Sequence, residues 1–239
     1  MKKKILVFTG SRADFGILLP LINKIKEEKS FNLTLIAGPH HYQNATGKTY
    51  KEIKNNNLKI KDSQRYSFNK ITEKSILKYC GKSIIFFSNI INKHSPDLVI
   101  LLGDRYEVFV FAVCSFFLNI PIAHIHGGEI TEAAFDDGLR HSITKMSNLH
   151  FVCHDIYKKR VIQLGENPKN VHNYGSLALD QFKNKKYLDK QSLFKKFGLP
   201  INKQLILVTF HPETRSKFPY KKQIQVLMNC LKSIKNVSI

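Results

Sequence analysis

The sequence predicts an α/β protein built on a parallel, doubly wound, Rossmann-like sheet. Short apolar runs alternate with longer segments of helical periodicity along most of the 239 residues, which is the pattern of repeated strand–helix units. The apolar runs are nearly continuous, as expected for strands that helices cover on both faces. Three polar clusters directly follow predicted strands, and ligands bind at that edge of such sheets.

Each strand is predicted from an apolar run that ends at a glycine or at polar residues. The expected strands are residues 5–9, 33–37, 98–102, 122–125, 150–153 and 171–173. Helical spacing is found over residues 15–28, 51–55, 71–93, 107–118, 139–148 and 156–164. Pro20 fits the first helix only if it lies in the first turn.

The composition changes after Asp180, so we divide the chain into an N-terminal Rossmann-like domain, 1–180, and a second region, 181–239. The second region predicts a lysine-rich helix over 182–198, a buried strand over 205–209, a helix over 221–235 and the start of another strand. These few elements cannot bury their own apolar faces. We therefore expect a second α/β domain that is incomplete in this chain.

The bulk composition favours a cytoplasmic protein with a small anionic partner. No apolar run approaches the ~20 residues of a membrane span, and the apolar run near the start is shorter than the roughly 7–15 residues of a signal peptide. The net charge of +20 suggests an anionic partner. However, the lysines are spread along the chain without an aromatic-interleaved stripe, so a phosphorylated metabolite is favoured over nucleic acid.

The four cysteines, Cys80, Cys114, Cys153 and Cys230, are scattered and form no C-x-x-C pair. We expect buried free thiols rather than a structural zinc site.

The first two polar clusters are TGSRADFG and LGDRYE. Gly10 allows close approach of a ligand, the following helix N-terminus favours an anion, and Arg12 is a candidate for binding a phosphate or a nucleotide sugar. The dinucleotide fingerprint is absent. An ordinary turn capped by Asp14 is the alternative. Asp104, at the next strand end, is either a helix cap or a functional carboxylate.

The third cluster is HIHGGEITEAAFDDGLRH. His124 and His126 lie two apart on a predicted strand and would share a face, so with Glu129 they could ligate a metal. Against this, no second histidine pair appears, and the two glycines indicate room for a ligand. Asp136 and Arg140 are one helical turn apart; they form either a surface ion pair or the wall of a pocket, and the nearness of Glu129 favours the pocket.

Two further segments carry histidines. GPHHYQNATGKTY is a polar loop with His40 and His41, and TFHPET places His211 at the end of the first strand of the second region. His211 is a candidate site residue, with a structural role as the alternative.

In this order and spacing, FTGSRADFG, LLGDRYE, HIHGGEITEAAFDDGLRHSITK, GSLALD and TFHPET closely resemble the hydrolysing UDP-N-acetylglucosamine 2-epimerase family of bacterial sialic-acid and related nonulosonate pathways. The resemblance runs from Lys4 to about His211 and beyond. It implies two Rossmann-like domains in a glycosyltransferase-B arrangement, with the second domain truncated here and most uridine and diphosphate contacts in the missing part. It also implies a homodimer.

The resemblance implies a hydrolase that needs no cofactor and no metal. Such an enzyme removes the proton on sugar carbon 2, expels UDP to give a glycal, and adds water to give N-acetylmannosamine. The assignments on this pattern are Asp104, Glu129 and Asp136 as acid/base groups, Arg140 and His211 at the diphosphate leaving group, and Gly10, Arg12, His126 and Asp137 in substrate binding. Asp137 competes with Asp136, because more distant relatives often have glutamate at the latter position.

Several alternatives remain open on the sequence. The same chemistry on UDP-2,4-diacetamido-2,4,6-trideoxyglucose, a precursor of legionaminic-type sugars, is the close rival. Other classes are a metal-dependent hydrolase using His124, His126 and Glu129, a nucleic-acid binder, and an inactive remnant that still binds ligand.

Overall fold

The computed structural model describes residues 1–66, 72–132, 134–183, 187–210 and 218–239. The chain divides into two compact units: Met1–Thr131 together with Phe135–Lys183, and a smaller unit that contains Asn184–Ile239.

The larger unit is organised around a seven-stranded sheet in which all neighbouring strands are parallel. The strands are β1 (Lys3–Thr9), β2 (Phe31–Ala37), β3 (Ile60–Ser63), β4 (Leu98–Leu102), β5 (Ile122–Ile125), β6 (Leu149–Val152) and β7 (Val171–Asn173). Their order is β3-β2-β1-β4-β5-β6-β7. The winding direction reverses between β1 and β4, and in such sheets ligands bind outside the strand ends at this switch point.

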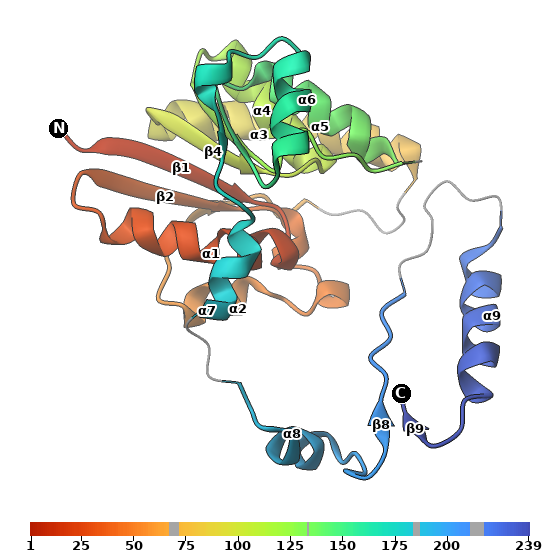
Figure 1. Cartoon of the computed structure of the whole chain (residues 1–239). Coiled ribbons are helices and arrows are strands. Elements are labelled where there is room, and N and C mark those ends of the chain that lie inside the picture. Colours follow the sequence, from red (N-terminus) through yellow and green to blue (C-terminus); the bar gives the residue numbers. More distant parts are fainter. Residues whose placement is uncertain (67–71, 133, 184–186, 211–217) are drawn as a thin grey trace. The chain divides into compact units, whose positions relative to one another are not determined.

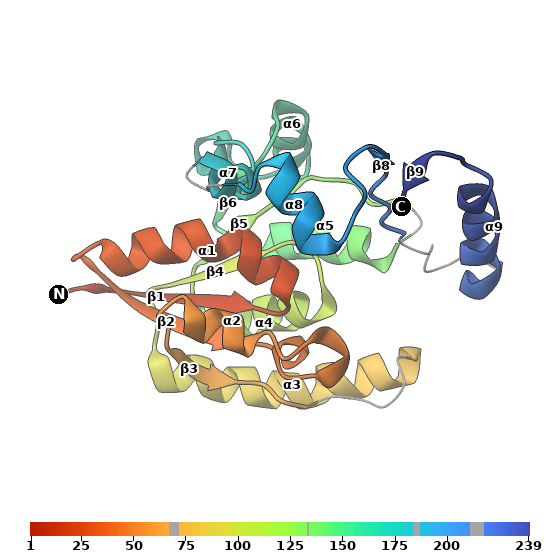
Figure 2. The same ribbon diagram turned by 90° about the horizontal axis from the view of Figure 1, so that it is seen from below.

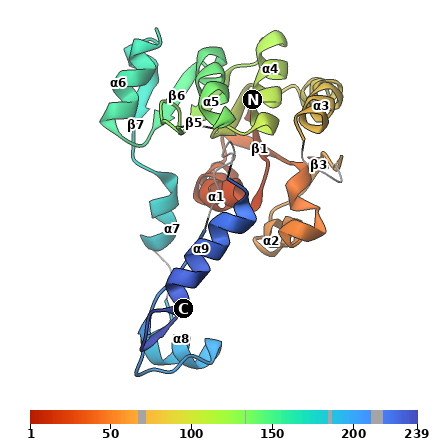
Figure 3. The ribbon, with the colours of Figure 1, turned by 90° about the vertical axis from the view of Figure 1, so that its right-hand side faces the viewer.

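Helices cover both faces of the sheet (Figure 1, Figure 2). One face carries α1 (Arg12–Glu27), α2 (Tyr50–Asn55) and the short α7 (Asp180–Lys183). The other carries α3 (Glu73–His94), α4 (Tyr106–Phe117), α5 (Phe135–Met146) and α6 (Asp155–Gln163), as the view along the sheet in Figure 3 also shows. The predicted doubly wound α/β class is therefore confirmed.

The strands are apolar on both sides because each side meets a helix layer. In β1, Leu6 and Phe8 belong to the core under α3 and α4, whereas Ile5 and Val7 belong to the core under α1. Phe8 packs against Phe87 and Phe111 with ring centroids 5.3 and 5.0 Å apart. This alternation explains why the strand sequences carry no polar face.

The smaller unit contains α8 (Lys190–Phe197), β8 (Gln204–Leu205), α9 (Tyr220–Lys232) and β9 (Val237–Ser238). β8 and β9 pair in parallel, with Gln204 opposite Val237. A strand, a helix and a parallel strand form one β-α-β unit, the building block of a Rossmann-like sheet.

Four details differ from the sequence prediction. Pro20 lies in the middle of α1, not in its first turn. The helix continues through it because Phe15, Leu18 and Ile22 are buried on its inner face, and this packing outweighs the one lost backbone hydrogen bond. β3 was not predicted, since it is an edge strand of sequence IKDS with no apolar run.

The predicted helix over 182–198 is wrong as one element. The described residues form α7 and α8 instead, and α8 begins where the side chain of Asp189 accepts a hydrogen bond from the Ser192 backbone at 3.0 Å. The predicted buried strand over 205–209 is also wrong, because β8 ends at Leu205 and Leu207 is 89% exposed. The described residues of the smaller unit form a two-stranded sheet and two helices, which provide no layer that covers these residues.

None of the helices in the described part of the chain is both long and apolar enough to cross a bilayer.

The close approach of β1 and β2 at their carboxyl ends generates a stability prediction. A Cβ on Gly38 would lie 2.9 Å from the Gly10 Cα and 3.1 Å from its carbonyl oxygen. Gly38→Ala should therefore destabilise the protein by about 1–3 kcal/mol in urea denaturation, because backbone cannot move aside cheaply. Gly81→Ala is the control, since nothing lies within 4 Å of its added Cβ. Alanine favours the helix there, so an increase of up to about 1 kcal/mol is expected. Equal effects of the two changes would contradict the packing argument.

Candidate active site

The side chain of Arg140 joins two carboxylates at the carboxyl edge of the sheet. Its Nη2 donates to Asp104 Oδ2 and to Thr131 Oγ1, the latter at 2.9 Å, and its Nη1 donates to Glu129 Oε2 at 3.0 Å. Arg140 is only 5% exposed. A guanidinium this buried requires charged partners, so three segments are held together at this point.

Each partner comes from a different element. Asp104 follows β4 after Gly103, which has a φ of +79°. Glu129 lies in the loop after β5, and Arg140 lies on α5. Because neighbouring parallel strands end at the same edge, Asp104 and Glu129 meet although they are far apart in sequence. Of the predicted acid/base residues, the structure brings these two together with Arg140.

The second carboxylate oxygen of Glu129, Oε1, contacts two other side chains. His126 Nδ1 lies 2.8 Å from Glu129 Oε1, and Cys153 Sγ donates to the same oxygen at 3.0 Å. Burial acts to raise the pKa of Glu129, but the contacts with His126 and Cys153 outweigh it and lower that pKa. Glu129 is therefore a carboxylate at neutral pH. Burial and the hydrogen bond to Glu129 raise the pKa of Cys153 to about 12.

His124 has a structural position, and the prediction that it shares a face with His126 is wrong. β5 ends at Ile125, and His126 turns away with a φ of +65°. The ring of His124 is fully buried, with Nε2 2.8 Å from the Gly103 carbonyl and Nδ1 3.1 Å from Thr144 Oγ1. Burial lowers its pKa to about 4, so the ring is neutral. Both nitrogens are occupied, so the metal set of His124, His126 and Glu129 does not form.

The two aspartates of α5 have different surroundings. Asp137 Oδ1 accepts from the Thr131 backbone at 3.0 Å and Oδ2 lies 3.7 Å from His141. It thus fixes the loop that carries Glu129. Asp136 is half-buried and makes no hydrogen bond or ion pair within the described residues. Arg140 pairs with the strand-end carboxylates Asp104 and Glu129. The surface ion pair between Asp136 and Arg140, which helical spacing offered as an alternative to a pocket wall, does not form between these described residues.

The TGSRADFG turn contains a capping box. Asp14 Oδ2 accepts from the backbones of Gly10 at 3.1 Å and Ser11 at 2.9 Å, and Ser11 caps α1. The sequence predicted that an anion would bind at this helix start. The backbone N–H groups of Gly10 and Ser11 are instead bound by the carboxylate of Asp14 itself. Arg12 is exposed and pairs with Glu52 at 3.0 Å. It lines a shallow cavity of about 450 Å³ together with Lys48 and Lys51.

Sequence reasoning missed a second buried charge cluster next to this turn. Glu107 is fully buried and pairs with Arg105 at 3.0 Å and with His40 at 2.7 Å. Burial acts to raise the pKa of Glu107, but His40 and Arg105 outweigh it and lower that pKa. The signal in the sequence was a single charge at the start of an otherwise apolar helix.

Sequence reasoning also missed Cys153. This residue directly follows β6, so it lies at the same edge of the sheet as Asp104, which comes shortly after β4. His211 lies outside the described residues.

The comparisons with known proteins agree on one family. The family model described as UDP-N-acetylglucosamine 2-epimerase matches residues 23–239. "GDP/UDP-N,N'-diacetylbacillosamine 2-epimerase (hydrolyzing)" of Campylobacter jejuni is 39% identical over the whole chain, which covers 62% of that relative. "Polysialic acid biosynthesis protein P7" of Escherichia coli is 40% identical over 98% of the chain and 60% of the relative. The chain thus spans about three-fifths of these relatives.

Solved structures agree on the fold. The UDP-GlcNAc 2-epimerase of Neisseria meningitidis, solved bound to UDP-GlcNAc, matches with a TM-score of 0.81 at 16% identity, over 98% of this chain and 64% of that one. The "putative UDP-N-acetylglucosamine 2-epimerase" of Listeria monocytogenes matches with a TM-score of 0.80 at 17% identity, over 100% of this chain and 62% of that one. At these identities the match establishes the fold alone.

The buried arginine generates a prediction about stability. Arg140→Met should lower the free energy of unfolding by about 3 kcal/mol, because it leaves Asp104 and Glu129 facing each other without a cation. Arg12→Met removes the same charge from an ion pair whose arginine side chain is 71% exposed, and should cost less than about 1 kcal/mol. Urea denaturation at neutral pH measures both. Similar losses for the two variants would contradict the proposed importance of the Arg140 contacts.

The neutral buried histidines generate a prediction about pH. Burial lowers the pKa of both His41 and His124 to about 4, against 6.5 in an unfolded chain. Between these values the unfolded state binds more protons, so stability falls as the pH is lowered from about 6.5 to 4, by up to about 1.4 kcal/mol per pH unit per histidine. Urea denaturation across this range measures the slope. His124→Asn should reduce it, whereas His154→Asn, at an exposed position, should not. A slope unchanged by His124→Asn would refute the assignment.

Proposed function

This chain belongs to the UDP-N-acetylglucosamine 2-epimerase family, and on that premise we propose that it takes part in hydrolysing 2-epimerisation of a UDP-linked N-acetylamino sugar. The primary substrate proposed is UDP-N-acetylglucosamine, with N-acetylmannosamine and UDP as products. The observation that carries the proposal is the pair of strand-end carboxylates, Asp104 and Glu129, held side by side by Arg140.

The proposed reaction has two stages. In the first, a carboxylate removes the proton from sugar carbon 2, the electron pair forms the double bond of a glycal, and the bond from carbon 1 to UDP breaks. In the second, water adds across the double bond and gives the free sugar with inverted configuration at carbon 2. A carbon-bound proton requires a positioned base, and the departing UDP requires an acid or a cation.

The surroundings of each carboxylate support a division of roles. Glu129 has a lowered pKa, so it is ionised at neutral pH and is suited to accept a proton. Asp136 is half-buried and has no partner in the described part of the chain, which leaves it available to substrate. Asp137 is occupied by the Thr131 backbone, so we assign it to positioning and favour Asp136 as the further acid/base group.

The contacts of Arg140 favour a positioning role. Three of the five N–H groups of its guanidinium are bound by Asp104, Glu129 and Thr131. Arg140 is also only 5% exposed, so most of its hydrogen-bonding capacity is directed at the protein rather than at a ligand. We propose that Arg12, His126 and Gly10 contribute to substrate binding and that His211 acts on the leaving group, as the family resemblance implies.

A second substrate is favoured by the descriptions of two relatives, from Campylobacter jejuni and Legionella pneumophila. The Campylobacter jejuni relative, at 39% identity, is described as a GDP/UDP-N,N'-diacetylbacillosamine 2-epimerase, and N,N'-diacetylbacillosamine is 2,4-diacetamido-2,4,6-trideoxyglucose. A sequence relative from Neisseria meningitidis serogroup B, described as a UDP-N-acetylglucosamine 2-epimerase, is 34% identical over 89% of this chain. We therefore retain UDP-2,4-diacetamido-2,4,6-trideoxyglucose as the alternative substrate of the same chemistry.

Proton NMR in deuterated water tests the proposal with each UDP-sugar in parallel, using the Campylobacter jejuni relative as a positive control. Release of UDP together with a free sugar that carries deuterium at carbon 2 would support elimination through a glycal. Release of a sugar that keeps its original hydrogen would exclude this route. The substrate that turns over faster identifies the specificity.

Substitution of the strand-end carboxylates gives the matching activity prediction. Asp104→Asn and Glu129→Gln should each lower kcat by roughly 100-fold or more, because the amides keep the shape but cannot exchange the proton. Glu27→Gln is the control, since Glu27 is an exposed carboxylate at the end of α1 that pairs with Lys24, outside the Arg140 contacts. Circular dichroism should show the same folded state in all three variants. Turnover near that of the unchanged protein would remove the substituted residue from the mechanism.

A further inference from the structure

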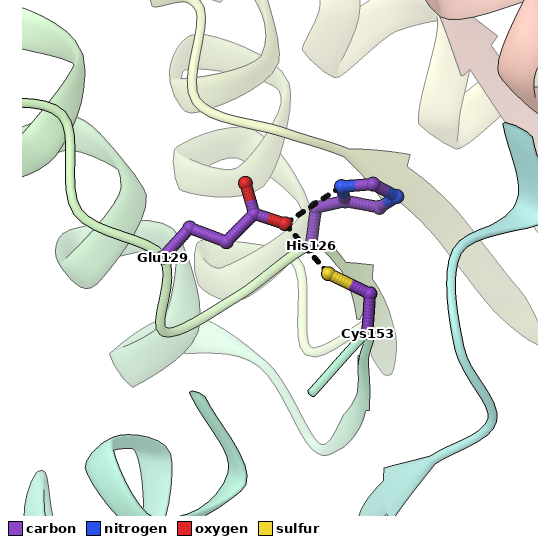
Figure 4. Close-up of side chains that lie close together, drawn as sticks. All are labelled: His126, Glu129 and Cys153. Atoms are coloured by element: carbon purple, nitrogen blue, oxygen red, sulfur yellow. Dashed lines mark hydrogen bonds and ion pairs between the residues drawn. The ribbon is translucent and has the colours of Figure 1, made fainter. Parts of the chain in front are cut away.

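Three side chains of the type that binds transition metals converge beside Arg140. His126, Glu129 and Cys153 point toward one another from the segments that follow β5 and β6 (Figure 4). His126 Nδ1 and Cys153 Sγ lie 2.8 and 3.0 Å from Glu129 Oε1, and the three potential ligand atoms all lie within 4.8 Å of one another.

The backbone presents these groups in fixed positions. His126 adopts a φ of +65°, a conformation that a non-glycine residue takes up only at a cost. Its backbone N–H donates to the Phe151 carbonyl at 2.9 Å and so ties the two strand ends together. Glu129 is held through its other oxygen by Arg140 at 3.0 Å. Such supporting contacts are what orient the ligands of metal sites.

The donor set is one that zinc prefers. Imidazole nitrogen, thiolate sulfur and carboxylate oxygen bind Zn²⁺ at about 2.0–2.3 Å in tetrahedral geometry. Bonds of that length place neighbouring ligand atoms about 3.3–3.6 Å apart. The present separations of 2.8 and 3.0 Å are hydrogen-bond distances, so an opening of about 0.5 Å admits the ion. Three protein ligands leave a fourth position for water.

The local charges also fit a divalent cation. Asp104 and Glu129 carry two negative charges, and Arg140 carries one positive charge. Binding of a metal ion releases the thiol proton of Cys153, which adds a third negative charge. An ion of charge +2 then brings the sum over these groups to zero. The buried Nε2 of His126 has no partner among the described residues, so it can carry the ring proton when Nδ1 is a ligand.

We propose that His126, Glu129 and Cys153 form a binding site for a thiophilic divalent cation such as Zn²⁺. The site uses Cys153 in place of His124. A bound ion takes up Glu129 Oε1 and so withholds this carboxylate from proton transfer; that consequence rests on the proposed function, whereas binding itself does not.

The test is titration of the reduced 239-residue chain with Co²⁺ in the absence of any UDP-sugar, so that its outcome is independent of catalysis. Cobalt bound by a thiolate gives a sulfur-to-metal charge-transfer band in the near ultraviolet. The unchanged chain should show this band with a stoichiometry of one, and Zn²⁺ should displace the cobalt and abolish the band. Circular dichroism confirms that each variant is folded.

The variants separate this site from other thiols. Cys153→Ser should abolish the band, and Glu129→Gln and His126→Asn should weaken cobalt binding by at least about tenfold. Asparagine is chosen at residue 126 because it tolerates a positive φ. Cys230→Ser is the control, because Cys230 is the exposed cysteine, and it should leave the band unchanged. Absence of the band in the unchanged chain, or its persistence in folded Cys153→Ser, would overturn the proposal.

Discussion

The guanidinium of Arg140 is the constraint on which the strand-end site depends. A cation that is only 5% exposed must be matched by negative charge close by. The match comes from Asp104 after β4 and Glu129 after β5, so two loops and α5 are fixed relative to one another by a single side chain. The position of this charge cluster follows from the sheet order, because β4 and β5 are neighbours in the sheet.

A set of uncharged buried contacts around His124 supports the charged contacts of Arg140. His124 bridges the Gly103 carbonyl and Thr144, and Thr144 in turn lies within 3.0 Å of the Arg140 carbonyl. The residue before Asp104 and the helix that carries Arg140 are therefore linked through a fully buried ring. Because burial keeps that ring uncharged, it fixes geometry without adding to the charge of the site.

Glu129 is the residue that the two proposals share. One oxygen accepts a hydrogen bond from Arg140, and the other contacts His126 and Cys153. The first contact suits a carboxylate held ready for proton transfer in a family of UDP-sugar epimerases. The second suits a ligand of a soft cation. Both uses draw on the same negative charge, so they exclude each other at any one moment.

The sequence by itself determined the class of fold and where the reactive groups would gather. Continuous apolar strands require cover on both faces, and parallel strands end at a common edge, so Asp104 and Glu129 could be placed together from the sequence alone. Which side chains touch was decided by the tertiary structure. The spacing allowed an ion pair between Arg140 and Asp136, but burial of the guanidinium selected Asp104 and Glu129 because they approach from two other segments. Likewise, the end of β5 at Ile125 and the positive φ of His126 separated two histidines that periodicity had placed on one face, and brought Cys153 to Glu129 instead. Contacts between distant segments depend on where the backbone turns, and no local pattern of residues specifies that.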